Sequence, residues 1–523
     1  MTGQRGGWRS AGRGAIAGLL AGAVAVGAGQ LVAGITGPAG SPVVVVGQLQ
    51  IDHTPPALKN FAISAFGSHD KQVLVSGILV VLGLFAAALG VLAMRRLWYG
   101  LAGLAIFGAV GVIAAVTRPA DTIGTVAPTL AAVAAAATAM LVLVRAARAG
   151  GPAPRPEPAG PVPGAPAVPG RRRFLAVSAA AAGTAAVTGL GGRVLAGRFS
   201  VTSARSALRI PPAARPAPAV PPGADLHIPG LAPFITPSQA FYRVDTAIVL
   251  PQVSPRDWQL RIHGMVRTQI TISFAELIRR PLTEAYITLC CVSNPVGGSY
   301  IGNALWLGAS LASLLREAGI RPGADQLLCT SADGFTSGAP AQAVMDGRDA
   351  LLAVAMNGAV LPVGHGFPVR MVVPGFYGYV SACKWLTDIE VTTYAAAVAY
   401  WSAGRGWSQR APVKTESRID VPSGNAPLAA GRTRVAGVAW AQHKGVEAVE
   451  VRAGLGPWNQ ARLAAVPGLD TWRQWVWDWD ATPGRHVLQA RATDKTGYTQ
   501  TPVQAPPEPN GATGYPSVSV TVR

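Results

Sequence analysis

Two adjacent cysteines stand out in a chain that is poor in thiols. Of four cysteines in 523 residues, Cys290 and Cys291 follow an apolar, strand-like run and precede a glycine-rich turn. A cysteine thiolate can bind a soft metal ion or attack an electrophile, whereas an isolated cysteine is more often a small buried apolar residue. The chain lacks the CxxC, CxxCH and HExxH patterns of zinc and c-type haem sites and the GxSxG turn of serine hydrolases. Four cysteines are also too few for a disulfide-stabilised exported domain.

A second group of polar side chains lies within residues 356–386. His365 and Arg370 flank a turn that contains proline, and Ser381 and Lys384 follow a turn rich in glycine and tyrosine. Histidine, arginine, serine and lysine that converge from turns suit a phosphate-bearing ligand with many hydrogen-bond acceptors. The residues by themselves do not identify that ligand.

Together the two regions resemble the sulfite oxidase family of molybdenum-cofactor enzymes, over about residues 231–523. The motifs that carry the resemblance are TLCC at 288–291, WLGASLASLL at 306–315, ADG at 332–334, the run from NG to KWL at 357–386, and the upstream run at 235–266. The resemblance implies an α+β molybdopterin domain followed by an all-β immunoglobulin-like sandwich. It also implies the molybdenum-molybdopterin cofactor (Mo-MPT) and two-electron oxygen-atom transfer at the metal, whose direction stays open.

The resemblance also implies roles for individual residues. Cys291 matches the cysteine that binds the metal and takes part in catalysis, and Cys290 would be a buried neighbour. His365 and Arg370 match the positions that hold the pterin phosphate, and Lys384 matches the turn that holds the pterin. The match implies three further cofactor-binding residues. Ser381 would act through the backbone around it, and Tyr242 and Arg243 lie in the upstream segment that also contacts the cofactor.

Two departures from the family pattern concern the substrate. The family has an arginine soon after the metal cysteine, whereas residues 292–296 read VSNPV, and the substrate-pocket tyrosine of the animal enzymes aligns with Ser337. Because an oxyanion needs fixed positive charge in a dry pocket, both a sulfur oxyanion and a sulfoxide are candidate small-molecule substrates. The alternatives are a sulfoxide reductase on the same scaffold and a non-catalytic cofactor-binding or interaction module. An enzyme of this kind would need a separate electron-transfer partner.

The elements that must position these residues begin with a membrane region. Apolar stretches of about 20 residues lie near 14–36, 73–94, 97–117 and 123–144, each long enough to span a bilayer as a helix. Eight arginines fall on one side of these spans, at positions 5, 9, 13, 95, 96, 145, 148 and 155. The positive-inside rule makes that side cytoplasmic. The net charge of +19 therefore reflects membrane topology, and we expect no nucleic-acid partner.

All seven histidines lie outside the predicted spans, so we expect a bundle that anchors the protein or docks a partner. A Pro-rich linker follows, and Arg171, Arg172, Phe174 and Leu175 then open an Ala-rich run that resembles a twin-arginine export signal or forms a fifth span. Either interpretation places the rest of the chain on the extracytoplasmic side of the cell membrane. The immunoglobulin-like domain would have a tryptophan-lined core, with a carbohydrate-binding tryptophan face as a minor alternative. The resemblance also implies that a homodimer would form through this domain. The predicted domains are 1–148 (four-span region), 149–170 (linker), 171–196 (fifth span or signal), 197–224 (Pro-rich spacer), 225–400 (molybdopterin domain) and 401–523 (immunoglobulin-like domain).

Overall fold

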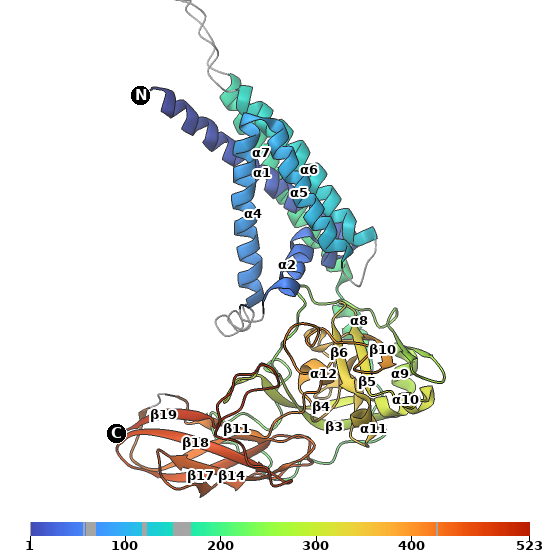
Figure 1. Cartoon of the computed structure of the whole chain (residues 1–523), viewed down its shortest axis with the longest axis vertical. Helices are drawn as coiled ribbons and strands as arrows, with labels where there is room; N and C mark the ends of the chain where they lie inside the picture. The colour runs from blue at the N-terminus through green and yellow to red at the C-terminus, as the bar shows by residue number, and fades with distance from the viewer. Residues whose placement is uncertain (1, 56–57, 59–69, 118–122, 150–168, 425–426) are drawn as a thin grey trace, which may run out of the picture. The chain divides into compact units, whose positions relative to one another are not determined.

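The computed structural model describes residues 2–55, 58, 70–117, 123–149, 169–424 and 427–523. The chain divides into two compact units (Figure 1). One comprises Met1–Ser200 and Thr246–Pro251, and the other comprises Val201–Asp245 and Gln252–Arg523. His69 and most of the predicted Pro-rich linker lie outside the described residues.

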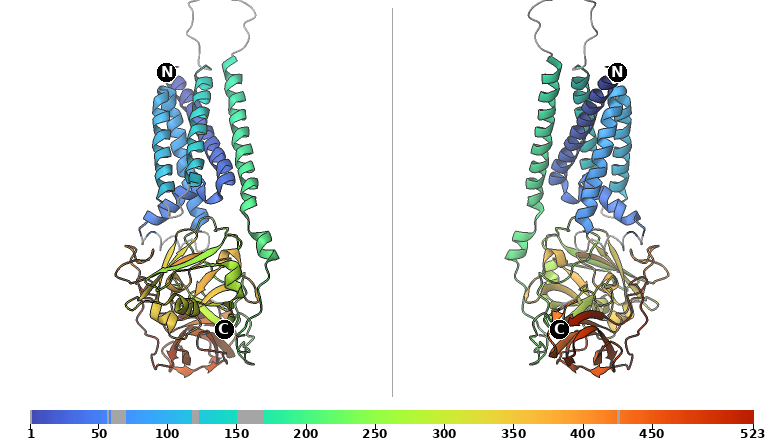
Figure 2. Two further views of the ribbon diagram at one scale, coloured as in Figure 1. Left: turned by 90° about the vertical axis from the view of Figure 1, so that its right-hand side faces the viewer. Right: turned by 90° about the vertical axis from the view of Figure 1, so that its left-hand side faces the viewer.

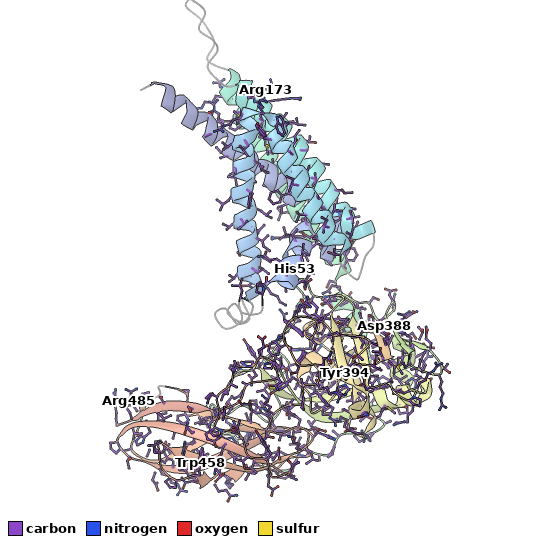
Figure 3. All side chains as sticks on the ribbon, viewed as in Figure 1. His53, Arg173, Asp388, Tyr394, Trp458 and Arg485 are labelled. Carbon is purple, nitrogen blue, oxygen red and sulfur yellow. The ribbon has the colours of Figure 1, made fainter. Side chains whose placement is uncertain are left out.

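The first unit is helical. Its helices are α1 (Thr2–Thr36), η1 (Pro38–Gly40), α2 (Pro42–His53), α4 (Asp70–Arg95), α5 (Leu97–Val116), α6 (Ile123–Ala149), α7 (Pro169–Ala196) and η3 (Gly197–Phe199). Within the described residues, α1, α4, α5, α6 and α7 lie in five segments that are long and apolar enough to cross a membrane. The apolar stretches of the sequence and the Ala-rich run after Arg171 therefore all form helices. The short helix α2, which ends at His53 (Figure 3), was not predicted, because it falls in a loop expected between two spans.

Glycines let the helices of this unit approach closely. Helix α1 packs against α4, α6 and α7, and α7 lies at the edge of the bundle (Figure 2). A Cβ atom added at Gly18 would lie 1.9 Å from the carbonyl oxygen of Ala86, and one at Gly90 would lie 2.1 Å from that of Gly14. In lipid, helices associate through such close backbone packing because no hydrophobic effect drives them together. The glycines of α1 and α4 therefore set the distance between these two helices.

The second unit starts with an α+β region that contains two sheets. One sheet has the strand order β2-β1-β10-β5-β6, and the other has the order β3-β4-β7-β8 with β9 paired to β7. The strands are β1 (Gln259–Gly264), β2 (Ile270–Ser273), β3 (Leu282–Cys290), β4 (Ile301–Ser310), β5 (Gln326–Ser331), β6 (Thr336–Pro340), β7 (Leu351–Met356), β8 (Ala359–Val360), β9 (Arg370–Val372) and β10 (Leu386–Thr392). The helices are α8 (Thr202–Ala207), α9 (Phe274–Arg279), α10 (Leu311–Ala318), α11 (Ala341–Met345), η4 (Val363–His365) and α12 (Gly378–Ser381). The predicted mixture of helices and strands is confirmed.

Local sequence explains the main elements of this region. Strand β7 reads LLAVAM and is buried at every position, as expected for a strand covered on both faces. Helix α10 begins where the Ser310 hydroxyl accepts a hydrogen bond from the Ser313 amide, and it ends at Gly319 in the left-handed conformation. Its apolar side packs into a core shared with β1, β5 and β10.

The segment predicted as a Pro-rich spacer is bound to the domain. Residues 214 and 215 donate their amide protons to the carbonyl of Leu282, and the amide of Glu284 donates to the carbonyl of Arg215. Upstream, the Arg205 side chain donates to the carbonyls of Val360 and Leu361. Proline favours extended backbone, and here that backbone lies along the free edge of β3.

The C-terminal region of this unit is all-β. Its strands are β11 (Glu416–Val421), β12 (Pro427–Leu428), β13 (Gly431–Trp440), β14 (Val446–Ala453), β15 (Asn459–Gln460), β16 (Arg462–Leu463), β17 (Arg473–Ala481), β18 (Gly484–Asp494) and β19 (Ser517–Val522). They form sheets of order β11-β13-β17-β16 and β12-β19-β18-β14-β15, which share one core. Trp475 and Trp479 of β17 lie in that core and are buried, so they are not available to bind a carbohydrate.

The close approach of α1 and α4 predicts the effect of enlarging one glycine. We expect Gly90→Val to lower the unfolding temperature of the detergent-solubilised protein, because the new side chain overlaps the backbone of α1 and costs about 1–3 kcal/mol. The matched control is Gly77→Val in the same helix, where an added Cβ meets no atom within 4 Å. Thermal unfolding followed by size-exclusion chromatography measures both, and equal unfolding temperatures would contradict this packing.

Candidate functional site

The turn after β3 fixes the position of Cys291. Its amide donates to the carbonyl of Tyr300 at 2.9 Å, and its carbonyl accepts from the amide of Asn294 at 3.1 Å. Burial raises the pKa of the Cys291 thiol, while hydrogen bonds from Ser293 and the charge of Lys384 act in the opposite direction. The thiol therefore keeps its proton unless a metal ion displaces it.

Cys290 faces the other side of the strand, as the alternation of side chains in a β-strand requires. It is 1% exposed and belongs to an apolar cluster with residues of the C-terminal region, including Val438, Trp440 and Trp472. Cys290 is thus a core residue beside the predicted ligand, in agreement with the role expected for it.

Arg370, the first residue of β9, is a buried cation. Its guanidinium donates to the carbonyls of His365 at 3.1 Å and Ala382 at 3.4 Å, and it lies 4.9 Å from the centre of the Trp306 ring. Within the part of the chain that the structure describes, Nε has no hydrogen-bond partner and no carboxylate pairs with the side chain. Burial lowers the pKa of Arg370 to about 10, so the group stays charged at neutral pH. A buried charge of this kind is costly unless an anion compensates it.

His365, at the end of η4, lies next to Arg370 and is 8% exposed. Its Nε2 atom is 3.0 Å from the carbonyl oxygen of Ser238. A carbonyl only accepts hydrogen bonds, so we assign the proton of the neutral imidazole to Nε2. Burial and the charge of Arg370 lower the pKa of His365 to about 4. The imidazole is therefore neutral at pH 7 until an anion arrives.

Lys384 and Arg243 meet at a carboxylate that the motifs did not reveal. Asp245 accepts a hydrogen bond from Nζ of Lys384 at 2.8 Å, and its Oδ2 lies 3.5 Å from Nε of Arg243. Its side chain is 3% exposed, so this is a buried acid shared by two cations. The only sequence signal was its place two residues after Arg243, inside the upstream run that resembles the family.

Tyr242 and Ser381 flank the same turn. The Tyr242 ring stacks on Phe241, and burial raises the pKa of its phenol, which the Cys291 and Cys290 sulfurs reinforce. A Cβ atom at Gly378, the first residue of α12, would lie 3.7 Å from the Tyr242 hydroxyl. The Ser381 hydroxyl points back at the carbonyls of Phe376 and Tyr377, at 2.9 and 3.1 Å. The Ser381 hydroxyl therefore stabilises its own turn. The expected contact with the cofactor would come from the backbone around Ser381.

Ser337, the position that aligns with the substrate-pocket tyrosine, is on β6, opposite Cys329, and is fully buried. Its hydroxyl acts on the Cys383 thiol, where it opposes the increase in pKa that burial causes. Ser337 is thus part of the core of the α+β region.

These residues fit a metal cofactor that carries a phosphate. The buried Arg370 side chain, whose Nε has no partner among the described residues, suits a phosphate oxygen. His365 is close enough to Arg370 and Lys384 for both positive charges to lower its pKa. The described residues include no group of three or more His, Cys, Asp or Glu side chains that could hold a metal ion. A soft metal bound at Cys291 must therefore take further ligands from a non-protein group, as a dithiolene provides.

In sequence, the chain is similar to known molybdopterin-dependent oxidoreductases. Residues 247–401 match the family described as the oxidoreductase molybdopterin binding domain. Sulfite oxidase from Gallus gallus is 32% identical over 299 residues, which cover 48% of this chain and 63% of the relative. Nitrate reductase (NADH) 1 from Arabidopsis thaliana is 32% identical over 186 residues, which cover 30% of this chain and 20% of the relative. The crystal structure of the sulfane dehydrogenase SoxCD from Paracoccus pantotrophus is similar with 25% identity and a TM-score of 0.48, over 55% of this chain and 81% of that chain.

The chain spans less than two thirds of the length of these curated relatives. The matched domain contains Cys291, His365, Arg370, Ser381 and Lys384, whereas Tyr242, Arg243 and Asp245 precede it. The family match implies the molybdenum-molybdopterin cofactor, which the buried cations and the thiol fit. Residues 247–401 thus form a molybdopterin-binding oxidoreductase domain that is similar in sequence to that of sulfite oxidase.

Proposed function

We propose that this protein is a membrane-anchored oxidoreductase that performs two-electron oxygen-atom transfer, with Cys291 as the protein ligand of molybdenum. The observation that carries the proposal is the buried, charged Arg370 without a carboxylate partner among the described residues. Such a group is costly in a protein that binds no anion and favourable in one that binds a phosphate. The same side chain lies beside His365, near Tyr242 and the Cys291 turn.

When bound, the cofactor supplies the redox change and the exchange of the oxygen atom. The protein binds and orients it. Arg370 and His365 hold the phosphate, and Asp245 keeps the Lys384 ammonium in place at the turn that holds the pterin. An anion at His365 would raise the pKa of the imidazole and so favour a proton on Nδ1, which could then donate to the anion.

The lack of a basic residue directly after Cys291 favours a sulfoxide as the substrate class over sulfite. Residues 292–299 contain no lysine or arginine, and Arg370 and Lys384 are assigned to the cofactor. Arg418, which donates to the carbonyl of Gly298 at 3.2 Å, is paired with Asp420. A neutral sulfoxide oxygen needs no fixed charge, whereas a sulfur oxyanion does. Sulfite oxidation is the second candidate, supported by the similarity to sulfite oxidases.

The helical unit supports an anchor with its catalytic domain outside the cytoplasm. The Arg148 side chain donates to the carbonyl of Ala93 at 2.8 Å, and Gly14 of α1 lies against Met94. The arginines that flank these positions therefore gather at one end of the bundle, which the positive-inside rule assigns to the cytoplasm. Five spans then carry the chain to the other side, whether α7 acts as a span or as a twin-arginine signal.

Electrons would pass to or from a separate carrier protein. The sequence has no CxxCH haem motif, and its candidate spans contain no histidine that could ligate a haem within the membrane. The immunoglobulin-like character of the C-terminal sandwich and a homodimer formed through it also belong to this proposal.

The metal assignment predicts the composition of the purified protein. Full-length protein made in cells that synthesise the cofactor should carry about one molybdenum per chain, because one thiolate and one dithiolene complete one site. We expect Cys291→Ser to lose most of this metal, as measured by elemental analysis together with pterin fluorescence. Cys329→Ala, which removes another buried thiol, is the matched control and should keep it. Wild-type protein without metal and pterin would favour the non-catalytic interaction module.

The neutral state of His365 predicts a pH dependence of the cofactor-free protein. Its pKa is about 4 in the folded state, against 6.5 for an unperturbed histidine, so the unfolded chain binds the proton more readily. The contribution of neutral His365 to the free energy of unfolding is therefore fully present above pH 6.5. It is lost as the pH falls toward 4, and the total loss is about 3 kcal/mol. Urea unfolding of wild type and His365→Gln at several pH values measures it. Parallel pH curves for the two proteins would contradict the assignment.

The substrate proposal predicts a gain of function. Val296 aligns with one of the basic positions of the family, and we expect Val296→Arg to lower the KM for sulfite by roughly ten-fold, because it adds a cation where an oxyanion would bind. Val296→Gln, of similar size and without charge, controls for the change in shape. Steady-state assays compare sulfite oxidation with sulfoxide reduction. An active wild-type enzyme that oxidises sulfite and ignores sulfoxides would reverse the preference stated here.

A further inference from the structure

We propose that the C-terminal β-sandwich positions the strand that carries Cys291, and that Thr288 is the positioning residue through which it acts. The contacts between Thr288 and the sandwich are observed in the structure. Their effect on a metal bound at Cys291 rests on the proposed function. The sandwich would then serve the cofactor site directly, in addition to any role in dimerisation.

Thr288 lies on β3, three residues before Cys291, and is 1% exposed. Three of its polar groups are bound by residues of the C-terminal region. Its amide donates to the carbonyl of Asp470 at 2.9 Å, and its carbonyl accepts from Nε2 of Gln442 at 3.2 Å. Its hydroxyl accepts from the amide of Trp472 at 2.7 Å.

These bonds close an exposed strand edge. β3 is the edge strand of its sheet, paired on one side with β4, so the amides and carbonyls on its other side have no partner within the sheet. Near its start, residues 214 and 215 bind Leu282 and Glu284. Near its end, Asp470 and Gln442 bind Thr288. The strand is thus held from its outer side at two points, and the second point is the one next to the metal ligand.

Trp472 connects the same network to the phosphate end of the site. The Thr288 hydroxyl donates to Oδ1 of Asn303 at 3.0 Å, and Nδ2 of Asn303 donates to the carbonyl of Phe234. Nε1 of Trp472 donates to the same carbonyl at 2.8 Å. Four residues further on, the carbonyl of Ser238 holds the ring of His365. One tryptophan therefore supports the strand of Cys291 and the loop behind His365.

The two turns of the sandwich that make these contacts are themselves fixed. Nδ1 of His443, next to Gln442, lies 3.4 Å from Oδ1 of Asp470. On the same face of β3 as Thr288, Cys290 packs with Val438, Trp440 and Trp472 in one apolar cluster. A shift of the sandwich would therefore move the end of β3 with it, and the turn that presents Cys291 follows directly.

The test uses the reactivity of Cys291 in full-length protein made without the cofactor. Iodoacetamide labelling resolved by tandem mass spectrometry measures how often the turn opens, because Cys291 is 9% exposed in the closed state. We expect Thr288→Val, which keeps the shape and removes the hydroxyl, to raise the labelling rate by roughly ten-fold. Thr288→Ser restores the hydroxyl and should return the rate to within about two-fold of wild type.

The matched control is Ser417→Ala, which removes a buried hydroxyl bonded to Gln500 inside the sandwich and leaves β3 untouched. Its labelling rate should equal that of wild type. If Thr288→Val does not fold, Gln442→Met removes the donor to the Thr288 carbonyl and should raise the rate by roughly three-fold. Unchanged rates in the folded variants, or an equal rise in Ser417→Ala, would overturn the proposal.

A second readout uses the metal-loaded protein. We expect Thr288→Val to change the electron paramagnetic resonance spectrum of the one-electron-reduced Mo(V) state, which would report an altered position of the Cys291 thiolate, while Thr288→Ser should give the wild-type spectrum. Wild-type protein without molybdenum would contradict the proposed function only. The labelling experiment would still decide whether the sandwich holds β3, the strand that leads to Cys291.

Discussion

A buried guanidinium needs an anion, and this requirement organises the cofactor site. Arg370 is enclosed by Trp306 and two backbone carbonyls, which satisfy part of its hydrogen-bonding capacity and none of its charge. Its charge also keeps His365 neutral, because two adjacent cations in a buried site repel each other. The second pair of cations, Lys384 and Arg243, is partly neutralised by Asp245. Among the described residues of the site, the guanidinium of Arg370 beside His365 is the cation that lacks a carboxylate partner, and this is where the phosphate is expected.

The position of Cys291 depends on a different constraint, the edge of a sheet. Cys291 follows β3, whose outer edge would otherwise expose unpaired backbone groups. The chain closes this edge with two segments that are distant in sequence, residues 214–215 and the turns of the sandwich around Gln442 and Asp470. The α+β region and the sandwich are therefore parts of one compact unit, and the thiol is presented from a strand held on both sides.

The helical unit follows the rules of a membrane environment. In lipid, apolar side chains gain little by packing together, so close backbone approach at Gly18 and Gly90 determines how α1 meets α4.

The sequence by itself determined the elements and the chemistry that depend on residue type and local spacing. Apolar runs of sufficient length predicted the five long helices of the first unit, and the motifs around Cys291 and from residue 357 to 386 predicted the cofactor, its metal ligand and a phosphate-binding pair. Tertiary structure decided what depends on contacts between distant residues. Asp245 follows no motif, yet folding brings it to Lys384, 139 positions away. The Ser381 hydroxyl is used by its own turn, the Pro-rich spacer lies along β3, and Thr288 is bound by residues more than 150 positions further on. No local pattern encodes such pairings, because the need of a buried donor or acceptor for a partner arises only once the chain has folded around it.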